Sequence, residues 1–217
     1  MDQINEDFIN NAIDHFGLYN KLRNLECIRA STKARLGTPL HYLYRNRDTN
    51  LQTRMIRRVM REIHYAAEVE DPSSQLYDPD IKTFIFWADI NRWRVFLKGP
   101  VGTPYEKKWW HLYVTFPENY PYQPPNFRFV TVPFHLNISQ EGRICSNYIE
   151  KGYLPSNHVI QIIQEIREIL IIPNPILPLN IKAYSLFYND IYEYERMARD
   201  SQYNAKMIIL IILKMIP

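Results

Sequence analysis

Apolar residues recur at helical spacing in three parts of the chain, which predicts three amphipathic helices. The first begins at Leu51 and ends at the turn sequence Asp71-Pro72-Ser73-Ser74. The second begins at Ser156 or Asn157, either of which suits an N-cap, and ends where the prolines start. The third begins at Ile181. The apolar positions that define the stripes are Ile56, Val59, Met60 and Ile63, then Val159, Ile160, Ile163, Ile166, Ile169 and Leu170, then Ala183, Phe187, Ile191, Tyr194 and Ala198.

Between the first two helices, apolar residues come in short runs separated by turn-forming residues, which predicts β-strands. The four runs cover residues 81–90, 93–97, 109–116 and 127–132. Short connections favour an antiparallel meander, because parallel strands need long crossovers. We therefore expect an α+β domain: a four-stranded antiparallel meander with one N-terminal helix, and C-terminal helices packed on one face of the sheet.

The two ends of the chain differ from this predicted core. Residues 1–50 hold a short helical pattern and a basic stretch, Lys21 to Arg47, without a sustained period. The last residues contain the apolar run Met207 to Leu213. This run is too short to span a bilayer, and it is too apolar to stay exposed to water without aggregating. We expect residues 51–207 to be the folded core, and residues 1–50 and 208–217 to bind stable protein partners. A loose N-terminus and a tail packed on its own domain are the alternatives.

Composition narrows the classes of function. The 217 residues carry 26 Lys and Arg against 23 Asp and Glu, a net charge of +3, which argues against a nucleic-acid binder. Cys27 and Cys145 form no CxxC pair, so we expect no cysteine zinc site and no disulfide scaffold. Unpaired thiols favour a reducing, intracellular compartment. The sequence has six glycines and no phosphate-loop motif, so we predict no cofactor or metal site.

One irregular segment gathers candidate chemistry. His135, Asn137 and Cys145 bring an imidazole, an amide and a thiol within eleven residues. Loops on rigid scaffolds are common places for such groups. Taken alone, Cys145 is more often a small buried hydrophobe than a nucleophile. We expect His111, inside a predicted strand, to be a packed or half-exposed structural histidine.

The chain from about Leu51 to Met207 resembles the ubiquitin-conjugating (UBC) enzyme family. The resemblance is long and ordered. Its matching residues are Arg57-Arg58-Val59-Met60-Arg61-Glu62-Ile63, Trp93, Gly99-Pro100, Thr103-Pro104-Tyr105-Glu106, Phe116-Pro117, Tyr120-Pro121, Pro124-Pro125, His135-Leu136-Asn137, Gly142-Arg143-Ile144-Cys145, Pro155 and Pro173-Asn174-Pro175.

This resemblance implies a chemistry and a set of partners. Cys145 would accept ubiquitin or a ubiquitin-like modifier from an activating enzyme as a thioester and pass it to a lysine. The Asn137 amide would stabilise the oxyanion, and His135 would hold the loop by hydrogen bonds.

The resemblance also carries over two sets of binding residues. Arg57, Arg58 and Glu62 fall where the family binds its activating enzyme, and Tyr122 and Pro155 fall where it meets ligases. For the two arginines, a solvated helix face is the alternative.

The sequence also departs from the family pattern, both near Cys145 and elsewhere. Leu136 replaces a proline, and Asn147 replaces a frequent aspartate. Leu177 stands in the segment 174–178, here called the gate, where the resemblance implies an aspartate or serine that assists the incoming amine. Lys107-Lys108 replaces a glycine pair, and Tyr153-Leu154-Pro155 replaces Trp-Ser-Pro.

Two hypotheses follow. The first is an active conjugating enzyme with Cys145, Asn137 and His135 at its centre and a weakened gate at Leu177 and Asn147. The second is a catalytically degenerate UBC-fold subunit that acts as an interaction module in a larger assembly.

Overall fold

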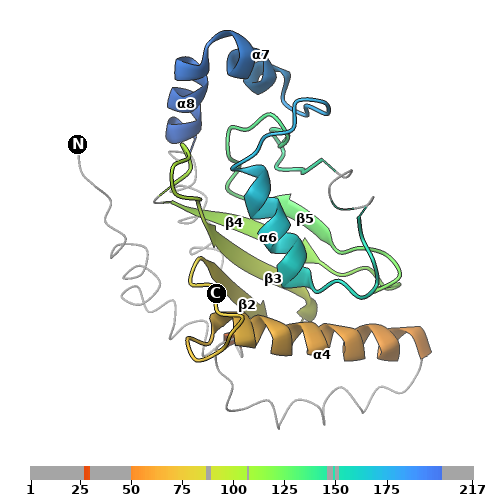
Figure 1. Cartoon of the computed structure of the whole chain (residues 1–217). Coiled ribbons are helices and arrows are strands. Elements are labelled where there is room, and N and C mark those ends of the chain that lie inside the picture. Colours follow the sequence, from red (N-terminus) through yellow and green to blue (C-terminus); the bar gives the residue numbers. More distant parts are fainter. Residues whose placement is uncertain are drawn as a thin grey trace, which may run out of the picture.

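The computed structural model describes residues 27–29, 50–86, 89–106, 108–145, 149 and 152–201. Figure 1 shows the helices and strands with the labels used below. In chain order they are β1 (Cys27–Arg29), α4 (Asn50–Glu70), β2 (Ile81–Phe86), β3 (Asp89–Lys98), β4 (Trp109–Thr115), β5 (Asn126–Phe129), α6 (Val159–Ile169), α7 (Ile181–Asn189) and α8 (Ile191–Asp200). Among these described helices, none is both long enough and apolar enough to cross a membrane.

The sheet is antiparallel throughout, with its strands in chain order from β1 to β5. The four predicted strands are confirmed as β2 to β5. Their boundaries shift, because Asp89 pairs with Phe86 and therefore begins β3. The fifth strand, β1, comes from the N-terminal extension and pairs with β2. The apolar pattern did not predict this three-residue strand.

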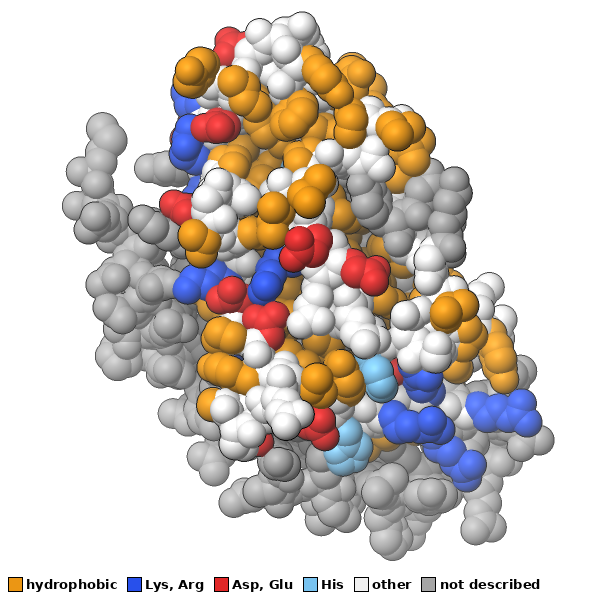
Figure 2. Space-filling model, in the orientation of Figure 1, with side chains coloured by type: hydrophobic (Ala, Val, Ile, Leu, Met, Phe, Trp, Pro, Cys, Tyr) orange, Lys and Arg blue, Asp and Glu red, His pale blue; other side chains and the backbone are white. Residues whose placement is uncertain are grey.

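At the other end of the chain, the structure has two helices where the sequence predicted one. Asp190 ends α7, and its side chain accepts a hydrogen bond from Glu193 N that starts α8 (3.1 Å). Ala183 of α7 and Tyr194 of α8 form a small apolar cluster with Leu136. Hydrophobic side chains also gather on the outer surface of this part of the molecule (Figure 2).

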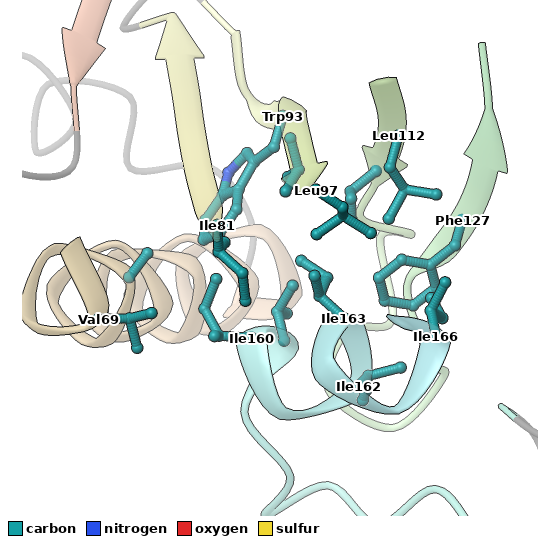
Figure 3. Packing of buried hydrophobic residues seen from close by; sticks show 14 of the residues in the cluster. Val69, Ile81, Trp93, Leu97, Leu112, Phe127, Ile160, Ile162, Ile163 and Ile166 are labelled. Carbon is teal, nitrogen blue, oxygen red and sulfur yellow. The ribbon is translucent and has the colours of Figure 1, made fainter. Parts of the chain in front are cut away.

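The main core lies between the sheet and the helices α4 and α6. Figure 3 shows Ile160 and Ile163 of α6 and Val69 of α4 among side chains from the sheet. Each fully buried side chain of this kind contributes about 1.5–3 kcal/mol to folding. The predicted apolar stripes of the first two helices therefore mark the buried faces correctly, and the expected α+β class is confirmed. Trp110 and His111, on β4, are also buried, so His111 is the packed histidine and not the half-exposed one of the two forms that the sequence left open.

The N-cap of α6 differs from the prediction. His158 takes that position, and its backbone N–H donates to Gln161 Oε1 (2.9 Å). Asn157, one of the two expected caps, instead accepts a hydrogen bond from Leu154 N at its side-chain oxygen (2.6 Å). This bond closes the loop before the helix, so the helix begins one residue later than expected.

Candidate functional site

The candidate site is built on the segment 134–145, here called the cysteine loop. Cys145 is buried, and its backbone N–H donates to Asn137 O (3.2 Å). A bridge between Ile138 and Ile144 continues this pairing. Gly142 makes the turn between them with φ 81°, and a Cβ there would lie 1.9 Å from Phe129 O, so only glycine fits. The cysteine loop thus folds back on itself and brings Cys145 beside Asn137.

His135 lies at the start of the loop with its side chain buried. Its Nδ1 accepts the backbone N–H of Asn137 (3.0 Å). Burial lowers the pKa of His135 to about 3, so the imidazole is neutral at physiological pH. A neutral ring can accept at Nδ1, and this bond fixes the backbone that carries Asn137.

Asn137 ties the cysteine loop to the gate. Its Nδ2 donates to Asn174 O (2.6 Å) and Leu177 O (3.2 Å), and its Oδ1 accepts from Asn174 N (2.7 Å). Both hydrogens of the amide are therefore engaged within the protein. In this conformation Asn137 could donate to an anion only by weakening one of these contacts, of which the one to Leu177 O is the longer.

Leu136 anchors the loop from the opposite side. Its side chain is buried against Ala183 and Tyr194, and its carbonyl accepts from Leu179 N (2.7 Å) and Asn180 N (3.0 Å). A leucine without the rigid ring of proline is thus held by packing and by two backbone hydrogen bonds. This accounts for how the loop keeps its shape despite the departure from the family pattern.

Two residues to which the sequence gave no role complete this support. The Tyr105 hydroxyl lies 2.8 Å from Phe134 O, to which it donates, and 2.9 Å from the Tyr194 hydroxyl. Lys108 Nζ donates to Arg199 O at the end of α8. Lys108 therefore holds the C-terminal end of α8. Only the folded structure shows this contact, because nothing in the sequence around Lys108 indicates that its side chain binds the end of a helix.

The gate carries no charged side chain. Ile176 is 81% exposed, and its backbone N–H donates to Asn174 Oδ1 (2.9 Å). Leu177, the residue of the gate for which the sequence predicted a weakened role, is half-buried. Asn147, the other predicted gate residue, lies outside the described residues. Asn174 also belongs to the site, although the sequence analysis gave it no role. The one signal in the sequence that could have indicated it is a polar residue between two prolines.

Of the three α4 residues expected to bind an activating enzyme, only Arg57 is exposed. The Glu62 carboxylate is buried, and it accepts from Arg58 Nε (2.6 Å) and Val159 N (2.9 Å). Arg58 also donates to Pro155 O (2.6 Å) and Asn157 O (2.7 Å). Arg58 and Glu62 therefore join α4 to the loop that precedes α6.

Tyr122 and Pro155, the expected ligase-binding residues, are exposed on two separate loops. The loops are joined because the Tyr153 hydroxyl donates to Pro121 O (2.6 Å). The second loop is in turn held by Arg58, as described above. The structure thus shows how α4 supports both loops. Within the described part of the chain, no group of three potential metal ligands is present.

Comparison with known proteins gives one family. Residues 58–202 match a family model described as ubiquitin-conjugating enzyme. The chain is 32% identical over 150 residues to ubiquitin-conjugating enzyme E2 S of Drosophila virilis, covering 69% of each protein. It is also 37% identical over 150 residues to a protein of Acanthamoeba polyphaga mimivirus named "Probable bifunctional E2/E3 enzyme", covering 68% of this chain and 11% of that protein.

A solved structure has the same fold. The E2 domain of a ubiquitin-conjugating enzyme from Toxoplasma gondii matches with a TM-score of 0.60 and 27% sequence identity. The match covers 69% of this chain and 97% of that domain.

Proposed function

Because the chain belongs to the ubiquitin-conjugating enzyme family, we propose that it carries ubiquitin or a ubiquitin-like modifier on Cys145 and transfers it to a lysine. The observation that carries this proposal is the pairing of Cys145 N with Asn137 O (3.2 Å) in a loop fixed by neutral His135. The pairing holds the backbones of Cys145 and Asn137 side by side. Acyl transfer through a cysteine needs a thiol and a nearby hydrogen-bond donor for the oxyanion, and these two residues are the ones that could supply them.

The reaction has two acyl-transfer steps. In the first, the Cys145 thiolate attacks the thioester carbonyl carbon of the modifier on its activating enzyme, and the activating enzyme's thiolate leaves. In the second, a lysine amine attacks the same carbonyl carbon on Cys145. The tetrahedral oxyanion then collapses, the Cys145 thiolate leaves, and the amine proton passes to solvent or to a base on a partner.

Asn137 is the donor that we assign to this oxyanion. Its hydrogen bond to Leu177 O (3.2 Å) is longer than that to Asn174 O (2.6 Å). The hydrogen on the longer contact is the one that can be shared with the oxyanion, while the shorter contact keeps the amide in place. A single oxyanion donor contributes about 10²–10³ in rate in other enzymes.

The partners follow from the same family membership. The activating enzyme would contact the exposed arginines of α4, including Arg57, whereas Arg58 and Glu62 would act by shaping the neighbouring loop. Ligases would contact the exposed Tyr122 and Pro155. We further propose that residues 51–207 form the UBC domain, and that residues 1–50 and 208–217 bind stable protein partners.

A charging assay tests the proposal. The full chain is mixed with an activating enzyme, ATP and ubiquitin, and then run on a gel with and without reductant. We expect an adduct that disappears with reductant. If no adduct forms with ubiquitin or with any ubiquitin-like modifier paired with its own activating enzyme, the proposal is wrong.

The second candidate function is a catalytically degenerate subunit that serves as an interaction module. Two observations favour it: both hydrogens of the Asn137 amide are engaged, and the gate has no charged side chain. In that case the chain would fail to charge and would bind its partners unchanged when Cys145 is replaced by Ala.

A further inference from the structure

The segment that leads into β4 holds α8 at two points. Lys108 Nζ donates to the Arg199 carbonyl at the end of the helix, and the Tyr105 hydroxyl lies 2.9 Å from the Tyr194 hydroxyl. Tyr194 and Arg199 are five residues apart, which is about 7.5 Å along a helix. Figure 1 shows α8 ending at the loop that leads into β4. Two contacts at separate points fix both the position and the direction of α8 relative to the sheet.

The rest of α8 is packed shallowly, so these two contacts matter. Its buried residues are Tyr194 and Ala198, and the others are half-buried or exposed. The last carbonyls of a helix have no partner inside it, and the partial negative charge at that end favours a lysine ammonium as donor. Lys108 therefore holds α8 more firmly than a surface contact of the same kind would hold a deeply packed helix.

Tyr194 joins α8 to the cysteine loop in two ways. Its hydroxyl bonds that of Tyr105, which donates to Phe134 O (2.8 Å). Its ring belongs to the same apolar cluster as the buried side chain of Leu136, and the rings of Tyr194 and Phe134 have centroids 5.9 Å apart. A shift of α8 would therefore remove packing from both Phe134 and Leu136.

The backbone of Leu136 depends on this packing. Leucine lacks the ring by which proline fixes φ, and within the described part of the chain the Leu136 N–H donates no hydrogen bond. Its carbonyl accepts from Leu179 N (2.7 Å) and Asn180 N (3.0 Å), just before α7. The next residue, Asn137, accepts the Cys145 N–H at its carbonyl (3.2 Å). The helices α7 and α8 thus support the backbone that is paired with Cys145.

We propose that Lys108 is a positioning residue for Cys145: by fixing the end of α8, it keeps the cysteine loop closed around the thiol. The kinetic part of this role rests on the proposed function, to which it adds a residue from outside the loop. Because Lys108 acts through Tyr194 and Leu136, its effect should vanish once the backbone at residue 136 is fixed by other means.

Alkylation of Cys145 tests the positioning without any partner protein. The full chain is treated with iodoacetamide in the absence of denaturant, digested with trypsin and analysed by mass spectrometry, which separates Cys145 from Cys27. Because Cys145 is buried, it reacts when the loop opens. Lys108→Met should raise the rate of alkylation about fivefold, since the hydrogen bond from the ammonium to the helix end is lost. An unchanged rate would overturn the proposal.

Three further variants separate positioning from a general loss of stability. Lys108→Arg keeps a cation that can donate to Arg199 O, so it should react as slowly as the unaltered chain. Arg196→Met removes ion pairs that lie within α8, so it should also leave the rate unchanged. Leu136→Pro fixes φ at residue 136, and adding Lys108→Met to it should change the rate by less than about twofold.

Two results with these variants would overturn the proposal. One is an effect of Arg196→Met as large as that of Lys108→Met. The other is an equal effect of Lys108→Met in the unaltered chain and in Leu136→Pro.

Hydrogen exchange decides the question if Leu136→Pro does not fold. The Leu179 and Asn180 N–H groups donate to Leu136 O, so their exchange measures how often this contact opens. Lys108→Met should speed their exchange about fivefold and leave that of the Val159 N–H, at the start of α6, unchanged. Equal changes at both places would show that Lys108 supports the whole fold and not the loop, and no change at Leu179 and Asn180 would also overturn the proposal.

A kinetic arm distinguishes this proposal from the proposed function. If the chain charges, discharge to free lysine should be at least about threefold slower in Lys108→Met, because a misplaced reacting group costs rate, and Lys108→Arg should restore it. If the chain never charges, the proposed function fails while alkylation still decides the role of Lys108. If the chain charges and Lys108→Met discharges as fast as the unaltered chain, the positioning role fails while the function stands.

Discussion

Asn137 uses both polar atoms of its side chain to hold the gate. Asn137→Ala should lower the free energy of unfolding by about 2–3 kcal/mol, because it removes three hydrogen bonds and leaves their part-buried partners without one. Urea denaturation measures this. Asn189→Ala is the control, since that exposed amide makes one long contact to Ser185 (3.3 Å) and its loss should cost less than about 0.5 kcal/mol. Equal losses would mean that Asn137 does not hold the gate.

At Leu177, the backbone and the side chain have separate roles. The carbonyl accepts from Asn137, so a change of side chain can leave that contact in place. Leu177→Asp should speed discharge of the thioester to free lysine, by up to about 10²–10⁴-fold, because a carboxylate can accept the amine proton. Single-turnover gels measure the rate. Leu179→Asp, two residues further on, should not. Fast discharge by the unaltered chain would contradict this account of the gate.

Among elements, α4 has an exposed face and a face that supports the neighbouring loop. Arg58→Ala should lower the free energy of unfolding by about 3 kcal/mol, because it leaves the buried Glu62 carboxylate without its cation. Arg57→Ala, one residue away and exposed, should change stability by less than about 0.5 kcal/mol but slow charging by the activating enzyme.

Urea denaturation and initial charging rates separate the two variants. If Arg57→Ala destabilises the fold as much as Arg58→Ala does, the assignment of the two faces of α4 is wrong.

The sequence predicted those helices and strands whose hydrophobic pattern lies within their own residues. The stripes of α4 and α6 repeat over several turns and were assigned to the correct faces. By contrast, β1 exists because Cys27, Ile28 and Arg29 pair with β2, which no local pattern reveals. The break between α7 and α8 depends on one side chain, that of Asp190, which caps the second helix. The apolar stripe continues across this break, so the sequence pattern did not reveal it.

The same distinction holds for the candidate site. His135, Asn137 and Cys145 could be grouped because one loop carries all three. The bonds from Asn137 to Asn174 and Leu177 join parts of the chain 37 and 40 residues apart, so they required the fold. Helical spacing predicted which face of α4 is buried in the core. It did not predict that the loop before α6 covers Arg58 and Glu62.

At the scale of the whole molecule, two buried histidines should make the fold sensitive to acid. Burial lowers the pKa of His135 to about 3, and burial together with nearby Arg94 lowers that of His111 to about 3. In the unfolded chain both rings titrate near 6.5. Below that pH the unfolded chain binds two protons that the folded chain does not, so stability is lost as the pH falls from about 6.5 towards 3.

Urea denaturation at pH 7.5 and pH 5 measures this loss. The two histidines together should account for a fall of about 4 kcal/mol in the free energy of unfolding. His111→Phe, which keeps the ring stacked on Phe96, should remove about half of it. The result would be contradicted if the variant and the unaltered chain lost stability equally between the two pH values.

The central claim is that Cys145 carries the modifier. The direct measurement is charging of three full-length proteins with ubiquitin, activating enzyme and ATP: the unaltered chain, Cys145→Ser and Cys27→Ser. We expect a reductant-sensitive adduct on the unaltered chain and on Cys27→Ser. On Cys145→Ser we expect either no adduct or one that resists reductant, because serine forms an oxyester. A reductant-sensitive adduct that persists on Cys145→Ser would contradict the account.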